Sequence, residues 1–109
     1  MSDGEAVYWP RPLAARERVL NDAMELIVGD RNQSYNDPIE NFSQIASLWS
    51  TYLGVEIEPH DVAVLNILQK VSRMMTSPER MDHWTDIAGY AGCGYECVES
   101  THGRTEADH

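Results

Sequence analysis

Two cations and two carboxylates in the second half of the sequence have the types and spacing for phosphate chemistry. Asn66, Lys70 and Arg73 lie at positions i, i+4 and i+7, so a helix there places them on one face. Asp82 and Asp86 lie one turn apart on a following helix. Mg²⁺ prefers carboxylate oxygens, and Lys and Arg neutralise phosphate oxygens. The pattern therefore predicts Mg²⁺ at the two aspartates and phosphate at the two cations.

The same residues also fit a purely structural interpretation. Only the short segment TSPER separates the two helices, so we expect them to be antiparallel neighbours. In this register Arg73 lies opposite Asp82, and Lys70 lies near Asp86, as two interhelical salt bridges. Two acids spaced by four residues also occur on ordinary solvated helix faces. The sequence leaves both interpretations open.

Further residues extend the predicted site. Glu40 and Asp61 are candidate metal ligands, although each also lies in a first helical turn, where an acid caps the helix or interacts favourably with its dipole. Arg31, in the loop before the second helix, is a candidate phosphate ligand. Tyr35, in the same loop as Arg31, is a candidate for contact with a nucleobase. Loop residues without a role would look the same.

Four predicted helices position these residues. Apolar side chains recur at helical spacing over the segments 13–28, 38–53, 59–75 and, from residue 79 or 80, to 98. The segment 59–75 has apolar residues around most of its circumference, which predicts a buried central helix. No segment is convincing as a strand. The sequence therefore predicts an all-α, four-helix bundle-like single domain.

The predicted helical domain spans residues 13–98. Residues 1–12 form a polar, proline-interrupted N-terminal arm, and residues 99–109 form an acidic tail that we expect to be disordered. A chain of 109 residues is one domain with a modest core.

The last predicted helix contains three glycines, Gly89, Gly92 and Gly94. Each costs about 1 kcal/mol relative to alanine in a helix interior. Close approach of another helix would offset this cost, either within one chain or across a two-fold axis. We expect a homodimer or a higher homo-oligomer.

Composition restricts the partners and the compartment. The net charge is −10, because 18 acids oppose 8 bases, which argues against a nucleic-acid partner. No apolar run approaches the roughly 20 residues that span a bilayer, and no signal peptide is evident, so we expect a cytoplasmic protein without a membrane partner. Cys93 and Cys97 lie one turn apart, which is awkward for a disulfide, so free buried thiols are expected.

Four segments together resemble a known family. They are GDRNQSYNDPIENF, SLWSTYLG, PHDVAVLNILQKVSR and DHWTDIAGYAGC, and the resemblance covers residues 13–98. The chain resembles small helical proteins of unknown function that are common in actinobacterial phages and prophages. That family is in turn similar to the all-α nucleoside triphosphate pyrophosphohydrolases of the MazG type. Those enzymes are usually oligomeric, depend on Mg²⁺, and cleave an NTP or dNTP to the monophosphate and pyrophosphate.

The second resemblance implies a nucleotide substrate and a Mg²⁺ cofactor. MazG-type enzymes carry E-E-x-x-E on one helix and E-x-x-D on a later one. Asp82 with Asp86, or Glu79 with Asp82, is a loose counterpart of the second motif. The first motif is not matched, because the segment 38–53 offers only Glu40 at that place.

Under this resemblance Asp82 and Asp86 are the catalytic residues. They would hold Mg²⁺ with Glu40 and Asp61, and the metal would lower the pKa of an attacking water. The substrate-binding residues would be Lys70, Arg73, Arg31 and Tyr90.

Two other functions remain open: a non-catalytic dimeric phage adaptor that binds a host or phage protein, and a nucleotide sensor. A cleft between the aspartates and the cations would favour the hydrolase. Ion pairs closed on each other without a cavity would favour the adaptor.

Overall fold

The computed structural model describes residues 11–29 and 37–103, and these form α-helices and no strand. The helices are α1 (Ala15–Val28), α3 (Pro38–Leu53), α4 (Pro59–Thr76) and α5 (Met81–His102). The all-α prediction is confirmed for this part of the chain. The helix α5 continues to His102, beyond the predicted end at Val98, so the predicted disordered tail begins with a helical turn.

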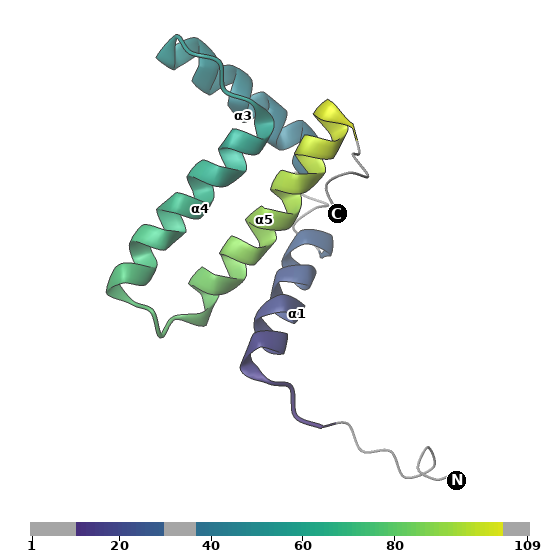
Figure 1. The fold of residues 1–109 in the computed structure, drawn as a ribbon, viewed down its shortest axis with the longest axis vertical. Helices are drawn as coiled ribbons and strands as arrows, with labels where there is room; N and C mark the ends of the chain where they lie inside the picture. Colours follow the sequence, from purple (N-terminus) through teal and green to yellow (C-terminus); the bar gives the residue numbers. More distant parts are fainter. Residues whose placement is uncertain (1–10, 30–36, 104–109) are drawn as a thin grey trace, which may run out of the picture.

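The helix α5 lies at the centre of the arrangement. Figure 1 shows α4, α5 and α1 side by side with α5 in the middle, while α3 crosses the end where α4 begins. The helix α5 contacts all three of the other described helices, whereas α1 contacts α5 alone among them. The prediction of a buried central helix at 59–75 is therefore wrong.

The apolar circumference of α4 is only partly covered. Its buried residues are Val62 and Ala63, which face α5 and α3. Several of its other large apolar side chains are exposed, because no described element covers that side of α4; they are Val64, Leu65, Leu68, Val71 and Met75. Amphipathicity indicated how much of α4 is apolar, but not which part of that surface the chain itself buries.

The core lies where α3, α4 and α5 meet. It consists mostly of small or medium side chains: Phe42, Ala46, Val62, Ala63, Cys93 and Cys97. Both cysteines are free and buried, as expected. Burial raises the pKa of the Cys93 and Cys97 thiols, and nearby negative charge adds to the effect. None of the described helices is long and apolar enough to cross a membrane.

The glycines of α5 allow neighbouring helices to approach within one chain. A Cβ at Gly94 would lie 2.8 Å from the Cβ of Ala63, so α4 and α5 pack almost backbone to backbone there. A Cβ at Gly89 or Gly92 would instead lie 3.6 or 3.9 Å from side-chain atoms of Ile27 on α1. Packing within the monomer therefore explains Gly94, whereas a Cβ at Gly89 or Gly92 would make only an ordinary contact.

Local chemistry explains where the helices begin and end. The Asp37 carboxylate accepts hydrogen bonds from the backbone N–H groups of Ile39 and Glu40, at 2.8 and 3.1 Å. Pro38 occupies the first helical position, where its missing N–H costs nothing. At the other end of α3, Gly54 adopts a left-handed conformation with φ 73° and donates to the Ser50 carbonyl.

Candidate functional site

The helices α1 and α5 border a groove with a volume of about 630 Å³. Its lining residues are Asp22, Glu25, Leu26, Met81, Asp82, Thr85 and Asp86. Four of them are carboxylates, two from each helix, and each pair is spaced by three or four residues so that it shares a helix face. We call this the acidic groove. Carboxylates from two rigid helices are a suitable ligand set for a hard divalent cation.

One of these carboxylates is also held by α4. The Lys70 Nζ lies 2.8 Å from Asp86 Oδ2, and about a quarter or less of each side chain is exposed. The predicted register of the α4–α5 pair is confirmed at this contact. Lys70 thus neutralises one carboxylate of the acidic groove from the side opposite α1.

The second predicted salt bridge, between Arg73 and Asp82, is wrong. Asp82 pairs with Arg80, whose Nε and Nη2 donate to the two carboxylate oxygens at 3.2 Å each. Partial burial alone would raise the pKa of Asp82, but the hydrogen bonds and charge of Arg80 outweigh it and lower that pKa below its ordinary value. Arg80 precedes the first residue of α5, so it reaches Asp82 locally. Arg73 is exposed and forms no ion pair within the described ranges.

The other predicted site residues lie elsewhere. Glu40 is exposed in the first turn of α3, and the Asp61 carboxylate accepts a 2.9 Å hydrogen bond from the Glu58 backbone at the start of α4. Because α4 and α5 are antiparallel, that start lies far from Asp82. Tyr90 packs against the core. The structure does not bring Glu40, Asp61 or Tyr90 to the acidic groove, and Arg31 and Tyr35 lie outside the described residues.

Sequence reasoning missed the two acids of α1. Asp22 and Glu25 form a D-x-x-E pair on one helix face, which is visible in the sequence. The sequence did not indicate that this face lies against the start of α5. Thr85 was also missed: its side chain is buried, and its Oγ1 has no hydrogen-bond partner among the described residues. Thr85 lines the acidic groove between Asp82 and Asp86.

Ion pairs among the described residues neutralise only part of the charge in the acidic groove. Lys70 and Arg80 pair with Asp86 and Asp82, whereas no ion pair is formed by Asp22 or Glu25 within the part of the chain that the structure describes. Four carboxylates against two cations leave two negative charges. This is the charge of one divalent cation with opposite sign.

The chain is similar to phage proteins. The Gene 55 protein of Mycobacterium phage D29 is 49% identical over 77 residues, which cover 71% of this chain and 51% of that protein. The Gene 55 protein of Mycobacterium phage L5 is 49% identical over 75 residues, which cover 68% and 48%. The chain thus spans about half the length of these curated relatives. No solved structure matches it.

A family match covers most of the described helices. The domain of unknown function DUF6378 matches residues 18–98, which include every residue of the acidic groove. The expected membership of a phage protein family is therefore confirmed. The chain belongs to the DUF6378 family.

Proposed function

We propose that the chain is a Mg²⁺-dependent nucleoside triphosphate pyrophosphohydrolase, with its metal in the acidic groove. The observation that supports this function is the meeting of two acidic pairs, one from α1 and one from α5, around a single groove. The resemblance to MazG-type enzymes implies an acidic motif on each of two helices. In this proposal Asp22 and Glu25 of α1 supply the first pair, in place of the segment 38–53.

The proposed chemistry follows from the charges of the acidic groove. Mg²⁺ bound by the carboxylates would also bind triphosphate oxygens and lower the pKa of a water molecule. That water would attack at the phosphoanhydride between the α- and β-phosphates of the NTP or dNTP, the bond to the bridging oxygen would break, and the monophosphate and pyrophosphate would be released. Lys70 lies 2.8 Å from Asp86 and would be released towards the phosphates when the metal takes over that carboxylate.

The test combines ligand binding with turnover. The purified chain is heated with Mg²⁺ alone and with each NTP and dNTP, and pyrophosphate release is then assayed. A ligand at a hundredfold excess over its Kd stabilises the folded state by about 2.7 kcal/mol, which a thermal shift detects. Asp22→Asn should abolish both signals and is the cleaner variant, because Asp22 makes no ion pair among the described residues.

Glu40→Gln is the matched control, since it removes an exposed acid that lies away from the acidic groove. It should keep the nucleotide-dependent shift and the pyrophosphate release. No shift with any nucleotide, or equal loss in both variants, would contradict the proposed function.

A second candidate function is the dimeric adaptor, which the exposed surface of α4 favours. Val64, Leu68, Val71 and Met75 are 47%, 56%, 37% and 82% exposed and recur with spacings of four, three and four residues. This is the spacing of a coiled-coil seam, so a second copy can pack α4 against α4 about a two-fold axis. The closed Lys70–Asp86 pair also agrees with an adaptor.

Mass measurement by light scattering tests this second candidate. The wild-type chain should be a dimer and Leu68→Glu a folded monomer, because a charge in the seam opposes burial. A monomeric wild-type chain would contradict it.

A further inference from the structure

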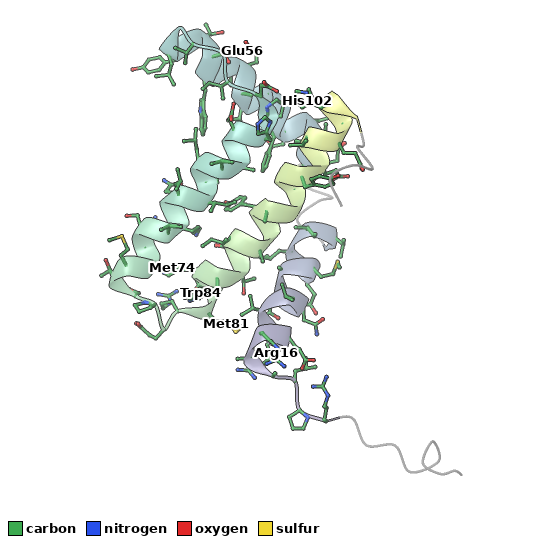
Figure 2. The ribbon with its side chains drawn as sticks, viewed as in Figure 1. Arg16, Glu56, Met74, Met81, Trp84 and His102 are labelled. Atoms are coloured by element: carbon green, nitrogen blue, oxygen red, sulfur yellow. The ribbon has the colours of Figure 1, made fainter. Side chains whose placement is uncertain are left out.

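A second group of potential metal ligands lies at the opposite end of the α4–α5 pair from Asp82. It consists of Glu58, which precedes α4, His60 in the first turn of α4, and His102 at the end of α5. Figure 2 shows His102 and Glu56 near one end of the α4–α5 pair, with Met74 and Trp84 near the other. The fold brings Glu58 and His102 together although 44 residues separate them in the sequence. Imidazole and carboxylate groups are ligand types of zinc sites in proteins.

The donor atoms are already close together. Glu58 Oε1 lies 2.9 Å from His102 Nε2 and 3.9 Å from His60 Nδ1. All three donor atoms lie within 4.8 Å of one another. Donors bound tetrahedrally to zinc at 2.0–2.1 Å are separated by about 3.3 Å, so side-chain rotation alone can bring them to a metal. The side chains of His60, Glu58 and His102 are 32%, 35% and 52% exposed, which leaves a path for the ion and room for water.

A fourth residue, Asp61, lies beside His60. The second ring nitrogen of His60, Nε2, lies 3.5 Å from Asp61 Oδ1. The other oxygen of Asp61 accepts the 2.9 Å hydrogen bond from the Glu58 backbone, so the carboxylate is fixed in place. A carboxylate behind a metal-binding imidazole selects the tautomer with the free nitrogen towards the metal. With a metal bound by His60, Asp61 would therefore orient that imidazole and would not itself be a metal ligand.

We propose that Glu58, His60 and His102 form a site for Zn²⁺ or a similar borderline transition metal, with Asp61 orienting His60. Imidazole ligands favour such ions over Mg²⁺, which prefers oxygen. The bound metal joins the start of α4 to the end of α5, whereas the chain itself joins these helices only at the other end. This site does not depend on the proposed hydrolase. His102 lies outside residues 18–98, which match the DUF6378 family.

Calorimetric titration of the full chain with Zn²⁺ tests the proposal, with Mg²⁺ as the comparison. The wild-type chain should bind one Zn²⁺ and melt at a higher temperature, while Mg²⁺ should not bind at this cluster. Asp61→Asn keeps an acceptor for the Glu58 backbone and should weaken zinc binding by about 10–100-fold. His102→Ala and His60→Ala each remove a ligand and should weaken zinc binding more than Asp61→Asn does.

Glu56→Gln is the control, because Glu56 is an exposed acid two residues from Glu58 that is not part of the cluster. It should bind zinc as the wild-type chain does. The Co²⁺-substituted chain should show tetrahedral absorption without a thiolate charge-transfer band. A thiolate band would place the metal at Cys93 and Cys97 and overturn the proposal. Unchanged zinc affinity in His102→Ala, or a dimer that forms only with zinc, would also overturn it.

Discussion

Replacing Gly94 with alanine should separate α4 from α5. The new Cβ would lie 2.8 Å from the Cβ of Ala63, where an ordinary carbon–carbon contact is about 3.5–4.0 Å. Neither atom is at the end of a flexible side chain, and Ala63 is only 1% exposed. The two helices must therefore move apart by about 1 Å, which disturbs the packing along their whole contact.

The expected change in the free energy of unfolding for Gly94→Ala follows from two opposing effects. Alanine is better than glycine in a helix interior by about 1 kcal/mol. Overpacking a tight core contact costs about 1–3 kcal/mol, and the rigid contact at Gly94 places it near the upper end. The net loss in free energy of unfolding is then about 2 kcal/mol. For a domain of this size, this lowers Tm by about 8–16 °C.

Gly92→Ala is the matched control on the same helix. A Cβ at Gly92 would meet Ile27 at 3.9 Å, which is an ordinary contact, so only the helix-propensity gain remains. This variant should raise Tm by about 4–8 °C. Thermal unfolding followed by circular dichroism measures both changes.

The double variant Ala63→Gly/Gly94→Ala moves the methyl group from one helix to the other. It should restore nearly wild-type stability, although each single change is destabilising. The coupling between the two sites is then about 3 kcal/mol in a double-mutant cycle. If Gly94→Ala is as stable as Gly92→Ala, the backbone-to-backbone contact of α4 and α5 is refuted.

Three further results are expected. The hydrogen-bonded ion pair with Arg11 lowers the pKa of Glu17 to about 2, so its stabilisation is complete above the ordinary pKa near 4.5 and is lost as the pH falls towards 2; the Tm difference between wild type and Glu17→Gln should vanish over that range. Asp37→Ala should cost about 1 kcal/mol in urea unfolding, since two backbone N–H groups of α3 lose their acceptor, and no loss would contradict the cap. Cys93 and Cys97 should be alkylated slowly at neutral pH in the folded chain and quickly in urea, because burial raises their pKa; equal rates would contradict that burial.

Local signals predicted the helices well. The Asp37 cap and the left-handed Gly54 are set by neighbouring residues, so the bounds of α3 follow from the sequence alone. The Lys70–Asp86 contact was also predictable, because a short connection fixes the register of α4 against α5. The predicted Arg73–Asp82 salt bridge was wrong. Arg80 is only two residues from Asp82 in the sequence and pairs with it locally.

The position of α1 in the fold could not be predicted from local sequence patterns. Its D-x-x-E pair gives no indication of which helix it will face, and many acids on helix surfaces face only solvent. The acidic groove therefore depends on a long-range contact between α1 and α5. The exposed apolar face of α4 is a similar case, since an apolar helix pattern does not reveal whether the chain itself covers that face.

The attachment of α1 has a consequence for the dynamics of the acidic groove. Among the described helices α1 touches only α5, and Ala23 is its one fully buried residue. We expect such a helix to detach while the α3–α4–α5 core stays folded, so that its amide protons should exchange with solvent through sub-global opening. Each opening removes Asp22 and Glu25 from Asp82 and Asp86. A cation bound across the two helices would oppose that opening, so occupancy of the groove and protection of α1 would rise and fall together.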